Sequence, residues 1–208
     1  MKNLTILLFL LFSISCFSQD WDKVTMKNVC SFRLPKTMEV RKESSLPDRG
    51  VKQLHKINEW SYNTDRITLQ PQGMDAGIKT ATFLYGRIII SIEEGNKGDF
   101  TVIEKMPRND IELVKYMMVE MFLENSKKYG VGVLNITPVE IKKIGGKSAF
   151  YYSYNRNSSQ KGNSSVFVQV YRILDDDKAI EITLSYRQSE KSIWHTDFNK
   201  FINSIIFN

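Results

Sequence analysis

Cysteine and histidine are scarce in this chain, which limits the disulfides and metal sites that it could form. The 208 residues include two cysteines, Cys16 and Cys30, and two histidines. If Cys16 leaves with an export signal, no internal disulfide can form, and packing must stabilise the fold. Cys30 is expected to be a small buried hydrophobic residue. No ligand spacing supports a zinc site, and we expect no metal or other cofactor.

Catalytic motifs are also missing. The sequence holds no serine-centred nucleophile elbow, and residues 95–98 are too short and poorly placed to cradle a phosphate. His195 and Asp197 resemble an acid–base pair, but residues two apart on a helix point in different directions. Residues 175–177 lack the alternate spacing of a calcium loop and predict a hairpin turn. We therefore expect a protein that is not an enzyme.

A long apolar run occurs only at the start of the chain. Lys2 precedes an apolar segment, residues 4–12, which is shorter than the roughly 20 residues that span a bilayer. Residues 1–18 therefore predict a signal peptide. Cleavage after Ser18 would release residues 19–208 to the periplasm or the exterior, without a transmembrane segment. Alternatively, residues 13–16 resemble a lipobox, and Cys16 would anchor the protein to a membrane through a lipid.

The charge of the chain is moderately basic. Its 29 Lys and Arg against 23 Asp and Glu give a formal net charge of +6, spread along the sequence. An ordinary solvated surface accounts for this pattern, and a weak attraction to anionic envelope lipid or polysaccharide is a second interpretation. Export and the lack of a known module argue against nucleic-acid binding.

The last third of the chain carries the clearest structural pattern. Residues 180–187 alternate apolar and polar side chains, which predicts a strand with one buried face. Residues 139–144, 147–155 and 166–174 precede it as further strands, so an antiparallel meander is expected. Apolar residues then recur at every third or fourth position, which predicts a helix over about 192–206 that packs on the meander.

The middle of the chain predicts further strands and two loops. Residues 29–34 are expected to pair with 38–41 as a hairpin, and 66–70 form another strand. Residues 82–93 predict a long central strand covered on both faces. The glycine-containing segments 72–79 and 95–106 are predicted as loops.

A longer helix is predicted over about residues 109–127. Asn109 and Glu112 form a capping-box pattern at its start. The expected core stripe consists of four residues, Val114, Met117, Met118 and Met121. The opposite side also carries apolar residues, Tyr116, Val119 and Leu123. Either residues 95–106 fold over this side, the explanation we favour, or it is a binding surface made by Tyr116, Val119 and Leu123.

Several segments together resemble the PsbP-like α/β/α sandwich superfamily, which includes a photosystem accessory subunit and a Ran-binding transport factor. They are residues 32–35 with 38–40, 144–149, 182–186 and 198–207. The resemblance implies a single α+β domain over residues 19–208, with a mostly antiparallel sheet flanked by helices. It also implies a mostly non-catalytic protein that binds or stabilises other proteins, without catalytic residues to carry over.

Three functions are compatible with these observations. The first is a secreted or periplasmic non-catalytic protein that binds or stabilises an envelope protein. The second is a small-ligand or polysaccharide binder with a cleft beside the loops 72–79 and 95–106. The third and least favoured is a hydrolase whose site is assembled from scattered residues.

Overall fold

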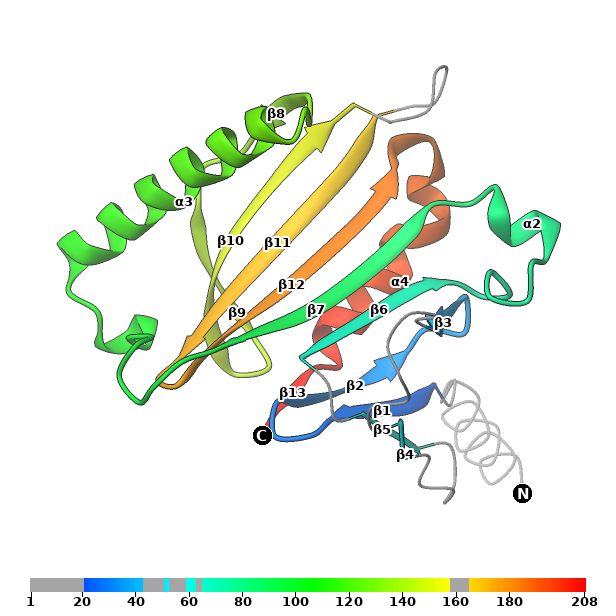
Figure 1. The fold of residues 1–208 in the computed structure, drawn as a ribbon, viewed down its shortest axis with the longest axis horizontal. Helices are drawn as coiled ribbons and strands as arrows, with labels where there is room; N and C mark the ends of the chain where they lie inside the picture. Colours follow the sequence, from blue (N-terminus) through cyan, green and yellow to red (C-terminus); the bar gives the residue numbers. More distant parts are fainter. Residues whose placement is uncertain (1–20, 43–50, 53–58, 63–64, 158–164) are drawn as a thin grey trace, which may run out of the picture.

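A long antiparallel sheet forms the centre of the computed structural model, which describes residues 21–42, 51–52, 59–62, 65–157 and 165–208 (Figure 1). Its strand order is β3-β6-β7-β12-β11-β10-β8, and β9 pairs with the first half of β10. The strands are β3 (Met38–Val40), β6 (Arg66–Pro71), β7 (Gly86–Glu94), β8 (Val133–Ile136), β9 (Glu140–Ile144), β10 (Lys147–Arg156), β11 (Val166–Asp175) and β12 (Lys178–Arg187). The predicted meander is confirmed as β9 to β12.

A second, smaller sheet contains both the first and the last described strands of the chain. Its order is β13-β2-β1-β5-β4, and all pairs are antiparallel except β1 with β5. The strands are β1 (Asp22–Met26), β2 (Cys30–Leu34), β4 (Val51–Lys52), β5 (Glu59–Tyr62) and β13 (Ile206–Phe207). The predicted signal peptide, with Cys16, lies outside the described residues, as does His55.

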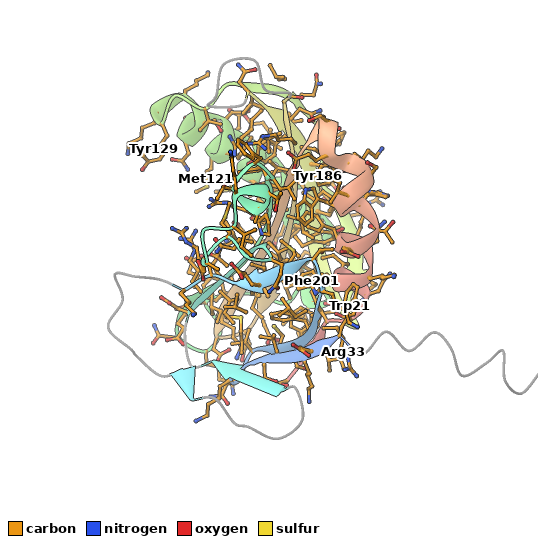
Figure 2. All side chains as sticks on the ribbon, turned by 90° about the vertical axis from the view of Figure 1, so that its right-hand side faces the viewer. Trp21, Arg33, Met121, Tyr129, Tyr186 and Phe201 are labelled. Carbon is orange, nitrogen blue, oxygen red and sulfur yellow. The ribbon has the colours of Figure 1, made fainter. Side chains whose placement is uncertain are left out.

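Helices cover the large sheet from two sides. Figure 2 shows α3 on one side of the sheet and α4 on the other. The helical segments are α2 (Lys79–Thr82), α3 (Arg108–Lys128) and α4 (Lys191–Asn203), with short 3-10 turns η1 (Ile103–Lys105) and η2 (Gln188–Glu190). The expected α+β sandwich of a mostly antiparallel sheet and flanking helices is thus confirmed.

The larger of two hydrophobic cores lies between the large sheet, the small sheet and α4. Trp194, Phe198 and Phe201 of α4 are buried there, and the Phe201 ring meets the Phe32 ring of β2 edge to face at 5.1 Å. The predicted packing of the closing helix on the meander is therefore confirmed. Each large side chain buried in this way contributes roughly 1.5–3 kcal/mol.

Four structural expectations need correction. Segment β3 pairs with β6, so it is not the hairpin partner of β2. The segment expected as a strand from residue 82 starts with the end of α2, and β7 begins at Gly86. In β7, Ile88 and Ile90 are buried but Ile89 is only partly buried, so the strand is not covered equally on both faces.

The fourth correction concerns the ends of the helices. No side chain caps α3, which starts at Arg108 directly after Pro107, so the expected capping box is wrong. Proline suits this place because its missing N–H would have no partner inside the helix. Helix α4 ends at Asn203, and Ile206–Phe207 form β13 instead of its last turn.

Candidate functional site

Helix α3 packs one side against the face of β10 and β11 that points away from α4. Val114, Met118 and Val119 lie against a second core that contains Phe150 and Tyr152 of β10. Phe122 contributes aromatic contacts, with ring centroids 5.7 Å from Tyr152 and 4.4 Å from Tyr154. The residues that face the sheet therefore recur at three and four positions, as expected for one side of a helix.

The outward side of α3 carries large apolar residues. The exposed fractions are 57% for Leu113, 64% for Tyr116, 49% for Met117 and 58% for Met121. Met117 and Met121 were expected in the core stripe, and the structure contradicts this. Apolar residues occur all around this helix, so the face turned inward is chosen by the fit to the sheet and not by the sequence pattern alone.

The three candidate binding residues of α3 are separated by this orientation. Tyr116 points to solvent, Val119 packs against the second core, and Leu123 is half-buried. The segment 95–106 was expected to cover all three: Ile103 joins the second core against which Val119 packs, but Tyr116 stays exposed. We therefore define the outer face of α3 as Leu113, Tyr116, Met117 and Met121.

The residues that the sequence suggested as catalytic or metal-binding candidates take part in hydrogen bonds and turns of the fold. The Asn199 side-chain amide lies 3.1 Å from His195 Nε2, whereas Asp197 accepts a hydrogen bond from Thr37 at 2.5 Å. The expected divergence of His195 and Asp197 is confirmed. Asp176 adopts a left-handed φ of 60° in the tight connection from β11 to β12, which confirms the predicted turn.

The described ranges of the chain contain neither a cluster of metal ligands nor a membrane-spanning helix. Among the described residues, no group of three or more His, Cys, Asp or Glu side chains is arranged to hold a metal ion. Within those ranges, no helix combines the length and the apolar character that crossing a bilayer requires.

The loop 72–79 is fixed by one carboxylate. Glu39 accepts backbone hydrogen bonds from Gly73 at 2.9 Å and from Asp75 at 2.7 Å, and one from the Gln70 side chain at 3.2 Å. Burial alone would raise the pKa of Glu39, but these hydrogen bonds outweigh it and lower the pKa. This loop precedes β7 and the segment 95–106 follows it, so the two lie at opposite ends of that strand (Figure 1). They do not border one cleft, contrary to our expectation.

The large sheet leaves part of its α3 side without a covering helix. In Figure 1 no helix passes in front of β12, β7 and β6, whereas α4 passes behind them. Thr183, Ser185 and Arg187 of β12 lie on this open side, in register with Ile89 and Arg87 of β7. These side chains are mostly polar, but Ser185 is buried and the other four are half-buried, so this side is only partly in contact with water.

Three arginines meet around Tyr85 at one end of this open side. Their guanidinium carbons lie 5.6 Å (Arg87), 5.9 Å (Arg156) and 5.5 Å (Arg187) from the centre of the Tyr85 ring. Arg156 also donates a hydrogen bond to the Tyr85 hydroxyl at 2.8 Å. We call these four residues the Tyr85 cluster. Sequence reasoning missed it, because the arginines come from three strands that are far apart in the sequence.

The carboxylate of Glu190 contacts two members of the Tyr85 cluster. Glu190 accepts a hydrogen bond from Arg187 at 2.8 Å through Oε1. Its Oε2 accepts two more, from the Tyr85 backbone N–H at 2.8 Å and from the Trp194 indole at 3.0 Å. Both oxygens of Glu190 are therefore occupied, and the cluster retains an excess of positive charge.

Comparisons with known proteins find similarity in the fold and not in the sequence. Neither a protein-family model nor a curated protein matches the sequence. The chain has a fold similar to those of PsbP and Mog1p. Cyanobacterial PsbP from Synechocystis gives a TM-score of 0.44 at 14% identity over 88% of both chains. The yeast Ran-binding protein Mog1p, from Saccharomyces cerevisiae, gives 0.45 at 10% identity over 90% of this chain and 95% of its own.

Two further solved structures come from other bacteria. LpqN of Mycobacterium tuberculosis, described as involved in cell envelope biogenesis, gives a TM-score of 0.37 at 11% identity, over 86% of this chain and 83% of its own. A protein of Bacteroides thetaiotaomicron gives 0.45 at 10% identity over 86% of this chain. The chain spans 45% of the length of that protein. At 10–14% identity, the likeness to these four proteins concerns the fold alone.

Proposed function

We propose that this chain is an exported, non-catalytic protein of the cell envelope that binds a partner protein through the outer face of α3. Export is inferred from residues 1–18, with lipidation at Cys16 as an alternative way to stay at the membrane. A non-catalytic role is supported by the missing catalytic motifs. It is also the role that the sequence resemblance implies.

The observation that carries the proposal is the exposure of four large apolar side chains on one helix. Leu113, Met117 and Met121 are spaced by four residues and follow one line along α3, with Tyr116 beside them. Leaving such residues in water costs free energy, and contiguous apolar surface is typical of protein interaction sites. Methionine side chains are flexible, so they can adapt to the shape of a partner.

Charged residues on the same face indicate the chemistry of the partner. Glu120 and Glu124 are exposed between and beyond the methionines, and Lys127 and Lys128 follow at the end of the helix. A matching surface would present an apolar strip flanked by basic residues opposite the two glutamates.

The proposal is tested by affinity capture from envelope extract, followed by a binding measurement with the purified captured protein. The test variant replaces Tyr116, Met117 and Met121 with serine. The control replaces Ile193, which is 43% exposed on α4, with serine. All three changed residues of the test variant are exposed, so both proteins should fold, which circular dichroism and thermal unfolding would verify.

The expected result is one envelope protein that binds the unchanged chain and the Ile193→Ser control alike. Its affinity for the α3 variant should fall at least about tenfold, since several buried apolar contacts are lost. Equal binding by all three proteins would show that the partner uses another surface. Turnover of a substrate that a single polar substitution abolishes would contradict the non-catalytic role.

A further inference from the structure

We propose that the Tyr85 cluster is a binding site for a phosphate group. The inference is independent of the α3 surface, because it rests on other side chains. Arg156, Val166 and Arg187 are paired across β10, β11 and β12, and Arg87 pairs with Ser185, two residues from Arg187.

The register places all three arginine side chains on one side of the sheet. Directly paired residues share a face, and so do residues two apart on a strand. Arg156 and Arg187 end their strands, and Arg87 is the second residue of β7. The cluster therefore occupies one corner of the open side, where the strands end.

Arg87 has donors that the fold does not use. Among the described residues, its recorded contact is with the Tyr85 ring, and neither a hydrogen bond nor an ion pair engages its guanidinium group. A guanidinium group carries five N–H donors. Arg156 uses Nη2 for the Tyr85 hydroxyl and Nη1 for the carbonyl of Asn157 at 3.4 Å. Both side chains are only partly buried, so donors remain open to a ligand.

The charge of the cluster favours an anion. Three guanidinium groups lie around one ring, while Glu190, the carboxylate that contacts them among the described residues, is engaged by Arg187, Tyr85 and Trp194. Contacts with the face of an aromatic ring partly stabilise such cations but leave their charge in place. Like charges held close together repel each other, and a bound anion would relieve that repulsion.

The arrangement of donors favours phosphate over carboxylate. Arg187 donates to Glu190 and to the Phe83 carbonyl at 2.6 Å, so Arg87 and Arg156 supply the open donors. These two arginines come from different strands, and a ligand that contacts both must accept hydrogen bonds from more than one direction. A carboxylate has two oxygens in one plane, whereas a phosphate ester has up to three terminal oxygens in a tetrahedral arrangement. Its charge of up to about −2 would also match the excess positive charge of the site.

The ligand class is therefore a phosphate ester, and its source is either a lipid headgroup or a soluble phosphorylated molecule. The test uses isothermal titration of the purified protein with pyrophosphate at constant ionic strength. Polygalacturonate serves as a carboxylate-only polyanion. Sedimentation with vesicles that contain phosphatidic acid, a lipid phosphomonoester, compared with phosphatidylcholine vesicles, tests the lipid source.

The variants separate the cluster from general surface charge. Arg87→Gln removes the arginine with unused donors, and Arg108→Gln removes an exposed arginine at the start of α3. Pyrophosphate should bind the unchanged protein and Arg108→Gln equally, and Arg87→Gln at least about tenfold more weakly. Without ligand, Arg87→Gln should unfold at the same or a higher temperature, because it removes one of three repelling charges.

Each outcome decides the proposal. Arg87-dependent binding of pyrophosphate and of phosphatidic acid vesicles supports a lipid headgroup, and such binding of pyrophosphate alone supports a soluble phosphate ester. Absence of pyrophosphate binding would overturn the proposal. So would equal weakening by both arginine variants, which indicates general charge, or tighter binding of polygalacturonate than of pyrophosphate.

Discussion

Gly86, at the start of β7, lies where the chain has no room for a side chain. A Cβ atom built on it would lie 2.5 Å from Cε2 of Trp194 and 2.6 Å from Cδ2. The indole is buried in the larger core and hydrogen-bonded to Glu190, so it cannot move aside easily. This glycine is required by the close approach of α4 to β7.

We therefore expect Gly86→Ala to destabilise the protein by about 1–3 kcal/mol, the usual cost of overpacking a core. Chemical denaturation of the variant and the unchanged protein measures the difference. In a Trp194→Phe background the same glycine substitution should cost less, because the smaller ring leaves space. An equal cost in both backgrounds would mean that the backbone, and not the indole, sets the requirement.

Glu104 is a second residue whose contribution to stability can be measured, because its contacts lower the pKa of its carboxyl group. Hydrogen bonds from Lys143 at 2.6 Å and from the backbone of Ser148 at 3.2 Å lower its pKa from 4.5 to about 2. A carboxyl group with a lowered pKa stabilises the folded state in its ionised form. That contribution is present above about pH 5 and is lost as the pH falls towards 2.

Glu104→Gln should therefore lower the thermal unfolding temperature at pH 7 by a few degrees at most, since the ion pair is partly exposed. The difference from the unchanged protein should shrink as the pH falls from 5 to 2. Lys143→Gln should behave in the same way, because it removes the partner. A difference that stays constant over this pH range would contradict the role of Glu104.

At the scale of whole elements, α4 contributes most to the larger core. Phe201 is fully buried against Phe32, whereas Ile193 of the same helix is exposed. Phe201→Ala should cost about 3–5 kcal/mol, a large part of a typical stability of about 5–15 kcal/mol. Ile193→Ala should change the free energy of unfolding by less than about 0.5 kcal/mol. Similar losses in urea denaturation of both variants would contradict this placement of α4.

An element can be predicted from the sequence when its own pattern is clear and its pairing partner lies nearby in the chain. The meander β9 to β12 was predicted because each strand pairs with its neighbour in sequence and shows its own alternation. The partner of β3 was not, because β6 lies beyond an intervening segment of the chain. The strand β1 was missed, since Asp22–Met26 is short and its alternation is weak.

The candidate sites show the same limit. The helical pattern placed Tyr116 on the side away from the core stripe, where we expected residues 95–106 to cover it, but it is exposed. Met117 and Val119 exchanged their expected sides, because only contact with β10 decides the rotation of α3. The Tyr85 cluster depends on the register of β7, β10 and β12. No local pattern around Arg87 or Arg156 reports that register, so the cluster could not be derived before the fold was known.

At the scale of the whole molecule, Cys30 reports on global unfolding. Its side chain is completely buried in the larger core, and burial raises the pKa of its thiol to about 12. Only the thiolate reacts quickly with disulfide reagents. In a Cys16→Ser variant, Cys30 is the sole thiol of the chain.

We expect that variant to resist labelling by a disulfide reagent in native buffer and to react at the rate of global unfolding as denaturant is added. Labelling followed against tryptophan fluorescence measures both rates on one sample. Fast labelling without denaturant would mean that the small sheet opens by itself.

The small sheet also determines when the chain can finish folding. Strand β13 pairs with β2, and the Arg33 amide donates to the Ser204 hydroxyl at 2.9 Å across 171 positions of sequence. During synthesis, the edge of β2 that β13 covers stays open until the residues between these two strands have emerged. Contacts this distant make folding slow. The nascent chain therefore passes through a long interval in which an unpaired strand edge is accessible to chaperones, to proteases and to other copies of itself.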